Sequence, residues 1–372
     1  MKNLGIKPNL LIFNLSVYKH LEDATQFNKV YCSPRMNNTP LNFHPSSQTY
    51  VSTIKVPSKC NVSDIVTFLS LQEIIIHGIV VYVDIFILHY LLPSNFPSDI
   101  PVSAILCDVH HGKGTITGAL DYLYSMDIKN LVLKQTISQN RLWSELGFTV
   151  HCMKIHYSGV NLRSSQASLM LRDRSPIPLF YGNFSSSHGF RKYLLKKAIK
   201  GGADISIRKV PKSQLDHLLD NTSTVLNPTL NGDINFRLVE AISAGCLVLM
   251  DKLSKDAQEI LCFKPGVHYL EYTYSSISKL LENLQPSDYN SLASNARLLL
   301  TSMIKNSHMG EIILESINSN SPCSINKSNS LCDILPAYEL VQDSIYSCSF
   351  NIDMLCLLPV FLHSTIAYER FQ

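Results

Sequence analysis

Short apolar runs that alternate with longer amphipathic stretches are the feature that most constrains this chain. The first series starts with the β-branched run IIIHGIVVYV near residue 74 and ends near residue 152. A second series of the same kind runs from residue 177 to residue 251. Strands that alternate with helices form parallel sheets with helices packed on their faces. The sequence therefore predicts two doubly wound α/β domains, whose ligands lie at the carboxyl ends of the strands.

A stretch rich in Ser, Arg and Pro separates the two series. We expect an amino-terminal domain over residues 1–160, a linker over 161–176, a second domain over 177–310 and a tail of unknown role over 311–372. The total of 372 residues fits two domains of common size. Residues 1–70 are rich in Asn, Ser, Thr and Pro and have weak periodicity, so we expect an irregular amino-terminal region, and we expect the tail to be helical.

The composition excludes several classes of protein. Apolar residues make up 45% and charged residues 16%, and the net charge is only +3, which argues against a disordered chain and against a nucleic-acid partner. Residues 74–92 are long enough to span a membrane, but His77 and Asp84 favour a buried strand, and no membrane span is expected. Ten cysteines without a CxxC pair, and no secretory signal, predict a cytoplasmic protein.

The most informative stretch is TVLNPTLNGDINFRLVEAISAGCLVLMD, residues 224–251. A strand delivers Asn227, a loop with Asn231, Gly232 and Asp233 follows, and a helix begins near Ile234. The amides at the start of that helix can face a phosphate. Glu240 lies about two turns further along, where its carboxylate can accept hydrogen bonds from the two hydroxyls of a ribose.

This stretch resembles the GT-B glycosyltransferases, and within them the spore-maturation-type proteins that carry a "glycosyl transferases group 1" carboxy-terminal domain. The matching positions include Leu226, Arg237, Asp251 and the later Pro265 to Tyr269, and the resemblance covers roughly residues 177–300. It implies two Rossmann-like domains facing a cleft, a nucleotide-sugar as co-substrate, no other cofactor and no metal. It also implies that Glu240 is the carboxylate that binds the ribose.

The residues expected to bind the donor come from several loops of the second domain. Gly182 follows a strand, where a glycine lets the backbone approach a pyrophosphate. Arg191 can neutralise phosphate charge, although it can equally be a surface arginine of a basic helix, and Arg208 falls where such folds hold the nucleobase. The full set is Gly182, Asn183, Arg191, Arg208, Asn227, Asn231, Gly232, Asp233, Asn235, Arg237 and Glu240.

One position departs from the family pattern. Related enzymes place a second glutamate eight positions before the ribose-binding one, and here that position is Gly232. Asp233 is adjacent and can take over its contact with the transferred sugar. The alternative for Glu240 itself is a solvated charge on the helix surface.

The first domain offers a second constellation, in the segment CDVHHG at the end of a strand. The resemblance reaches this segment, and Asp108, His110 and His111 are the expected catalytic residues. A histidine titrates near neutral pH and can take a proton from an acceptor hydroxyl, and we favour His110 for this role. Metal binding by Cys107, Asp108 and the two histidines, or simple packing, are the alternatives.

These observations predict a glycosyltransferase that moves a sugar from a nucleoside diphosphate sugar, by resemblance a UDP-sugar, to an acceptor. The acceptor can be a glycan, a protein or a small molecule. No Asp-x-Asp pair occurs in the chain, and the expected reaction is metal-independent. The alternatives are a nucleotide-sugar epimerase of the same fold and a non-catalytic nucleotide-sugar-binding protein.

Overall fold

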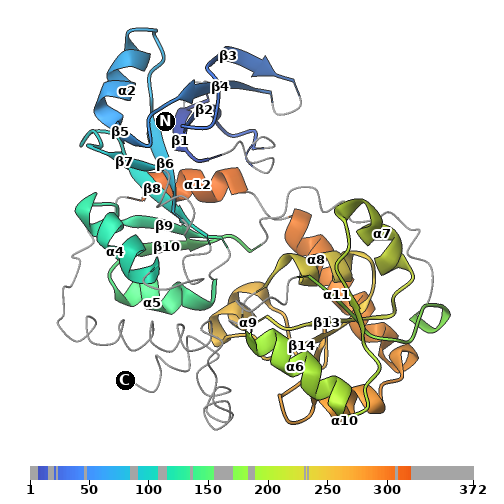
Figure 1. Cartoon of the computed structure of the whole chain (residues 1–372). Coiled ribbons are helices and arrows are strands. Elements are labelled where there is room, and N and C mark those ends of the chain that lie inside the picture. Colours follow the sequence, from blue (N-terminus) through green and yellow to red (C-terminus); the bar gives the residue numbers. More distant parts are fainter. Residues whose placement is uncertain are drawn as a thin grey trace. The chain divides into compact units, whose positions relative to one another are not determined.

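A computed structural model describes residues 7–15, 21, 24–45, 48–83, 91–107, 115–134, 137–154, 171–182, 189–229, 232, 234–305 and 309–319. These residues fall into two compact units (Figure 1). The first unit contains the described residues of 1–136, 140–158 and 307–335, and the second contains those of 137–139 and 159–306.

The first unit is built on an eight-stranded sheet in the order β10-β9-β8-β6-β1-β2-β4-β3. All neighbours pair in parallel except β3 and β4. The strands are β1 (Asn9–Phe13), β2 (Asn28–Ser33), β3 (Thr39–His44), β4 (Thr49–Lys55), β6 (Gly78–Val83), β8 (Val102–Leu106), β9 (Asn130–Leu133) and β10 (Thr149–Cys152). Two short strands, β5 (Lys59–Asn61) and β7 (Leu92–Ser94), pair separately, and the helices are α2 (Val62–Ser70), α4 (Thr115–Ser125) and α5 (Asn140–Glu145).

The expectation of an irregular amino-terminal region was wrong for the described residues. They form five strands and a helix, and β1 lies inside the sheet, between β2 and β6. One reason why the sequence did not predict these strands is that β2 contains a polar residue that is buried in the core. Lys29 is fully buried, and its ammonium donates hydrogen bonds to the Ala24 carbonyl at 2.5 Å and to the Thr49 hydroxyl at 3.0 Å. A buried lysine breaks the apolar run by which a strand of a parallel sheet is normally found.

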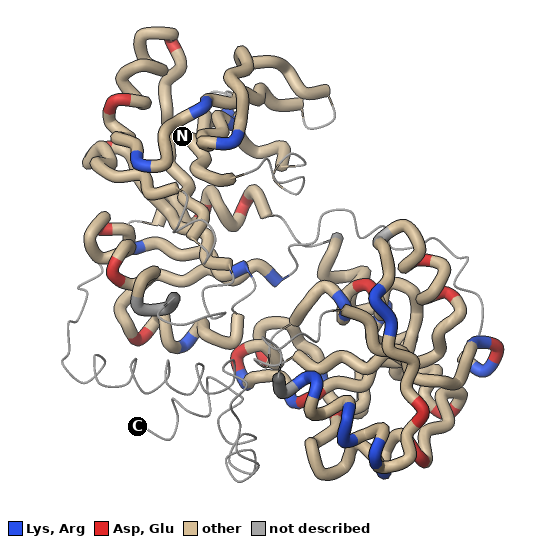
Figure 2. The backbone as a smooth tube through the Cα atoms, in the orientation of Figure 1, with Lys and Arg blue, Asp and Glu red and all other residues tan. Residues whose placement is uncertain are grey.

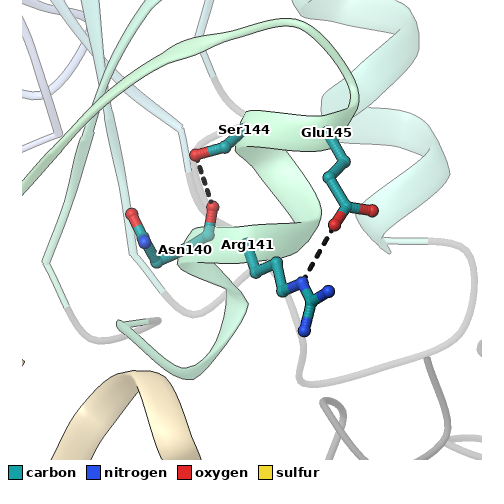
Figure 3. Close-up of polar contacts among 4 residues, drawn as sticks. All are labelled: Asn140, Arg141, Ser144 and Glu145. Carbon is teal, nitrogen blue, oxygen red and sulfur yellow. Dashed lines mark hydrogen bonds and ion pairs between the residues drawn. The ribbon is translucent and has the colours of Figure 1, made fainter. Parts of the chain in front are cut away.

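Helix α5 follows the three-residue 3-10 turn Ile137–Gln139 and is short, with an ion pair along it. The Arg141 Nε donates to Glu145 Oε1 at 2.9 Å, and the Ser144 hydroxyl donates to the Asn140 carbonyl at 2.9 Å (Figure 3). The ion pair is partly exposed and contributes at most a few tenths of a kcal/mol. The helix ends at Glu145, and Gly147, two residues later, has a φ of +91°, the left-handed region in which helices commonly terminate.

A helix from the far end of the chain, α12 (Met309–Asn318), packs on the sheet of the first unit. The Ser103 and Ser316 hydroxyls are 2.6 Å apart and both residues are buried, and His151 Nε2 lies 3.1 Å from the Ser319 hydroxyl. Gly78 allows the close approach, because a Cβ there would lie 2.9 Å from a methyl carbon of Ile317. The first nine residues of the expected tail therefore complete the fold of the first unit.

The second unit contains a five-stranded parallel sheet in the order β12-β11-β13-β14-β15. Its strands are β11 (Leu179–Tyr181), β12 (Ser206–Arg208), β13 (Thr224–Asn227), β14 (Leu247–Met250) and β15 (Leu270–Glu271). Its helices are α6 (Gly189–Lys200), α7 (Lys212–Asp220), α8 (Phe236–Ser243), α9 (Lys255–Leu261), α10 (Ile277–Glu282) and α11 (Asn290–Lys305). Leu226, Leu247 and Leu249 lie in one buried core with Leu194 and Ala198 of α6.

Each large sheet has a point where the order of its strands reverses. In the first unit β1, β2 and β4 succeed one another to one side, and β6, β8, β9 and β10 succeed one another to the other. The reversal lies between β1 and β6. In the second unit it lies between β11 and β13. Such switch points are where ligands bind, at the carboxyl ends of the strands.

The apolar segment near residue 74 forms the strand β6, all six residues of which are buried. No helix among the described residues is both long and apolar enough to cross a membrane.

Candidate functional site

The candidate site of the second unit lies where β11 and β13 end. Tyr181 ends β11 and Gly182 follows it, Asn227 ends β13, and α8 follows the loop after β13. Arg208, at the end of β12, pairs with Tyr181 in the sheet and is exposed. The structure thus places Gly182, Arg208 and Asn227, three of the predicted donor residues, along one edge of one sheet.

Arg237 is the centre of this edge. It is buried, its Nε donates to the Tyr181 carbonyl at 2.6 Å, and its Nη1 donates to Asn227 Oδ1 at 3.1 Å. Its Cζ lies 4.5 Å from the centre of the Phe180 ring. Burial lowers the pKa of Arg237 below its usual value, and neighbouring hydroxyls and carboxylates act against that shift. A guanidinium keeps its proton throughout the ordinary pH range, so Arg237 places a fixed positive charge beneath the two strand ends.

Gly182 allows Arg237 to lie so close. Its φ is +122°, and a Cβ at this position would lie 2.5 Å from Arg237 Nη2. The glycine was predicted because it lets a pyrophosphate approach the backbone. In the structure the atom that approaches is a nitrogen of Arg237.

Glu240 is partly buried on α8 and receives a hydrogen bond from the end of β11. The Tyr181 hydroxyl lies 3.0 Å from Glu240 Oε2 and also 3.3 Å from the Arg237 carbonyl. Burial raises the pKa of Tyr181 well above its usual value of 10, and the charge of Glu240 raises it further. The hydroxyl therefore stays protonated and can donate to the carboxylate. This contact disfavours the reading of Glu240 as a purely solvated surface charge.

Asn235 begins helix α8. Its side-chain oxygen accepts a hydrogen bond from the Leu238 amide at 3.1 Å, which is the standard N-cap arrangement. The predicted donor residue Asn235 thus uses its oxygen to stabilise the helix start.

The loop before α8 is fixed by a carboxylate at the end of β14. Asp251 accepts hydrogen bonds from the Thr229 amide at 2.7 Å and from the Thr229 hydroxyl at 2.9 Å. The same hydroxyl accepts from the Gly232 amide at 3.2 Å, and the Gly232 carbonyl accepts from the Ser254 amide at 2.9 Å. Gly232 has a φ of +65°, so a glutamate there would occupy a strained backbone conformation. This is a physical reason for the departure from the family pattern.

Arg191, on α6, is buried rather than on the surface. Lys192, Lys196 and Lys200 of the same helix are exposed, and Figure 2 shows positive residues along α6. The Arg191 Cζ lies 5.9 Å from the centre of the Phe180 ring. The alternative of a surface arginine is therefore wrong. Burial raises the pKa of the Tyr272 hydroxyl, and the positive charges of Arg191 and Arg237 oppose that shift.

Several predicted residues lie outside the described part of the chain: Asn183, Asn231 and Asp233 of the donor loops, and Asp108, His110 and His111 of the catalytic set. Their roles stay predictions. Among the described residues no group of three His, Cys, Asp or Glu side chains could hold a metal ion.

Two residues that contact predicted ones were missed by the sequence reasoning, Tyr181 and Thr229. Tyr181 belongs to an apolar strand, and only its place directly before Gly182 could have drawn attention to its hydroxyl. Thr229 is one of several polar residues in its loop, and nothing in the sequence distinguishes it.

Comparisons with known proteins agree with this geometry. Residues 188–314 match a family model described as "Glycosyl transferase-like". No curated protein matches the sequence. Among solved structures, HepE from Anabaena, in complex with UDP and glucose, is 13% identical with a TM-score of 0.54, covering 83% of this chain and 100% of its own.

Two further structures have the same TM-score of 0.54, and each is covered over 100% of its own length. They are OtsA in its apo form, 9% identical, and a glycosyltransferase from Rickettsia africae, 10% identical, and both cover 85% of this chain. The assignment to the spore-maturation-type branch stays a prediction. The chain has the fold of the GT-B glycosyltransferases, with a glycosyl transferase-like domain that covers most of its second unit.

Proposed function

We propose that this protein is a glycosyltransferase that moves a sugar from a UDP-sugar to the hydroxyl of an acceptor. The observation that carries the proposal is the Glu240 carboxylate, held by Tyr181 at the switch point of a glycosyl transferase-like domain. The UDP and glucose found with HepE support the choice of donor.

Glu240 would bind the ribose of the donor. A carboxylate can accept about four hydrogen bonds, and the Tyr181 hydroxyl supplies one of them. Two ribose hydroxyls can be accepted alongside it. By fixing one oxygen, Tyr181 would keep the carboxylate in the orientation that the ribose requires, which lowers the cost of ordering it on binding.

The positive charges beneath the strand ends would stabilise the diphosphate. During transfer the bond between the anomeric carbon and the diphosphate oxygen breaks, a bond to the acceptor oxygen forms, and the acceptor proton leaves to a base. Negative charge grows on the diphosphate, and fixed charges in a water-poor site stabilise such charge most effectively. Arg191, Arg237 and the start of α8 supply such a field. On this basis we propose a reaction that needs no metal.

The catalytic base belongs to the proposal as a prediction from the sequence. His110 would take the proton of the acceptor, with Asp108 and His111 beside it. Asp233 would contact the transferred sugar in place of the missing glutamate. The ten cysteines without a CxxC pair support a cytoplasmic location.

Calorimetry with UDP and UDP-glucose tests the donor site. Glu240→Ala should weaken UDP binding by about 1.5–3 kcal/mol, since it removes charge-assisted hydrogen bonds to the ribose. Tyr181→Phe should weaken it by about 0.5–1.5 kcal/mol, the usual value of one hydrogen bond. Glu259→Ala, at an exposed glutamate of α9, is the matched control and should bind as the wild type does. Unchanged affinity in the Glu240 variant would remove this residue from the site.

Turnover separates the proposal from the two alternatives. Release of UDP together with a glycosylated product supports transfer, and activity should persist in a chelator. A changed sugar configuration on the nucleotide without product indicates an epimerase. Binding of donor without turnover against any acceptor indicates a non-catalytic protein.

A further inference from the structure

Asn14 is a buried side chain at the switch point of the first sheet. It directly follows β1, which neighbours β6 at the reversal of strand order. Its exposed fraction is 1%, and its backbone amide donates to the Cys32 carbonyl at 3.1 Å. The residue thus lies at the carboxyl end of a central strand, which is the ligand-binding position of a doubly wound sheet.

The orientation of its amide follows from its neighbour. The Leu15 amide donates to Asn14 Oδ1 at 2.8 Å, so that atom must be the oxygen. The nitrogen, Nδ2, is buried and has no hydrogen-bond partner among the described residues. A buried donor left unpaired costs about 1–3 kcal/mol, and such a group requires an explanation.

The backbone around this amide is fixed. The Ser33 hydroxyl, at the end of β2, donates to the Leu15 carbonyl at 3.1 Å and accepts from the Arg35 amide at 3.1 Å. Both polar backbone groups of Leu15 are therefore paired, and Asn14 Nδ2 is the group left over. A donor held in place by its neighbours binds a ligand with little ordering cost.

The surroundings of Asn14 include an aromatic ring and a lysine. Pairing of Phe13 with Val81 places Asn14 next to Tyr82 along the two strands, and both side chains lie on the same face. The Lys134 ammonium, from the end of β9, lies 5.8 Å from the centre of the Tyr82 ring, and both side chains are buried. The Tyr82 ring and the aliphatic stem of Lys134 therefore give the surroundings of Asn14 a mainly apolar character, in which Asn14 Nδ2 is a donor left unpaired among the described residues.

We propose that Asn14 Nδ2 donates a hydrogen bond to a hydroxyl oxygen of the acceptor sugar. The inference rests on the proposed function, because it names a residue of the first unit that binds the acceptor. A neutral amide in apolar surroundings matches a neutral hydroxyl. The side chains that cover Asn14 must move aside for the sugar, and pairing the unsatisfied donor lowers the free energy of that change.

The test compares Asn14 with Asn9, at the opposite end of the same strand. Asn9 Nδ2 already donates to the Ile75 carbonyl at 2.8 Å, so Asn9→Ala is the matched control. Binding of glucose, galactose, mannose and N-acetylglucosamine, measured without nucleotide by saturation-transfer NMR and by thermal shift, identifies the sugar. Asn14→Ala should weaken its binding about 5- to 100-fold, whereas Asn9→Ala should leave it unchanged.

Asn14→Asp is the second variant, because as a carboxylate it keeps an oxygen acceptor for the Leu15 amide and replaces the amide donor by a negatively charged oxygen. It should lose sugar binding as Asn14→Ala does, while the affinity for UDP stays that of the wild type in both. Wild-type sugar affinity in either folded Asn14 variant would overturn the inference, and so would the failure of the wild type to bind any of the four sugars. Absence of UDP binding in the wild type would instead overturn the proposed function, and the two failures are therefore distinguishable.

Discussion

Two asparagines lie at the carboxyl ends of central strands at the two switch points, and their side chains form different numbers of hydrogen bonds. Asn227, in the second unit, accepts from Arg237 at 3.1 Å, and its nitrogen lies 3.5 Å from the sulfur of Met250. Asn14, in the first unit, accepts from the Leu15 amide, and its nitrogen has no partner among the described residues. Both are buried, with exposed fractions of 0% and 1%.

This difference in hydrogen bonding shows that the carboxyl end of a central strand can serve either the stability of the fold or the binding of a ligand. At the second switch point the side chains pair with one another, and the ligand is left to Glu240 and the charges around it. At the first, a polar group is unpaired within the unit. Removing groups from the paired edge should therefore reduce stability, whereas removing Asn14 should reduce binding.

Arg237→Met should have the largest effect. It removes two hydrogen bonds from a charged group to the ends of β11 and β13 and leaves their acceptors buried. At about 1.5–3 kcal/mol for each bond, we expect the free energy of unfolding to fall by about 3–6 kcal/mol in urea denaturation. Arg208→Met, at the exposed end of β12, is the control and should change it by less than about 0.5 kcal/mol. Equal effects of the two variants would contradict the central place of Arg237.

Gly182→Ala should have the second largest effect and lower the free energy of unfolding by about 2–4 kcal/mol. The new side chain combines a strained backbone with a contact against Arg237 Nη2. Gly202→Ala is the control that measures backbone strain without a new contact. Gly202 has a φ of +89°, and no atom of a described residue lies within 4 Å of the added Cβ. A loss of the same size in both variants would show that the contact with Arg237 contributes nothing.

The two asparagines themselves give the most direct comparison. Asn227→Ala leaves Arg237 Nη1 without an acceptor and should cost about 1–3 kcal/mol of unfolding free energy. Asn14→Ala loses one hydrogen bond but also removes an unpaired donor, so its cost should stay within about 1 kcal/mol. If Asn14→Ala proved the more destabilising of the two, its amide would be a structural group.

The smallest effect concerns the attachment of α12. Burial lowers the pKa of His151 below its usual 6.5, and its ring contacts the Ser319 hydroxyl. Because the pKa of His151 is lower in the folded than in the unfolded state, its neutral ring stabilises the fold above pH 6.5. This contribution is lost as the pH falls through the pKa that His151 has in the folded state. The melting temperature should therefore decrease slightly below pH 6.5. His151→Gln, which does not titrate, should reduce that decrease, and an identical pH profile would exclude His151 as its cause.

The second unit could be predicted from the sequence in most of its elements. Glycines end α6 and α8, apolar strands alternate with helices, and Glu240 stands in a recognisable pattern. The contacts within its site could not be predicted. Arg237 resembles a ligand-binding residue in the sequence, yet two of its nitrogens bind the protein itself, since β11 and β13 end side by side only in the folded sheet.

The first unit was harder to predict for a physical reason. Its strands before β6 carry polar residues whose hydrogen-bond partners lie outside the strand, as Ala24 and Thr49 do for Lys29. Periodicity detects a buried strand only when the buried residues are apolar. The place of α12 was equally hidden, because an amphipathic helix does not reveal which sheet it covers.

The position of α12 also sets an order on biosynthesis. The described sheet and helices of the second unit come from a continuous stretch that ends at Lys305, whereas the first sheet lacks one of its covering helices until residue 319 has been synthesised. On the ribosome the described sheet of the second unit, with its helices up to α11, can therefore form before the first sheet is fully covered, although it begins later in the sequence. Protease resistance of arrested chains ending near residues 340 and 372 would show this order, as about 30 to 40 residues remain in the exit tunnel, roughly 100 Å at about 3.3 Å per extended residue.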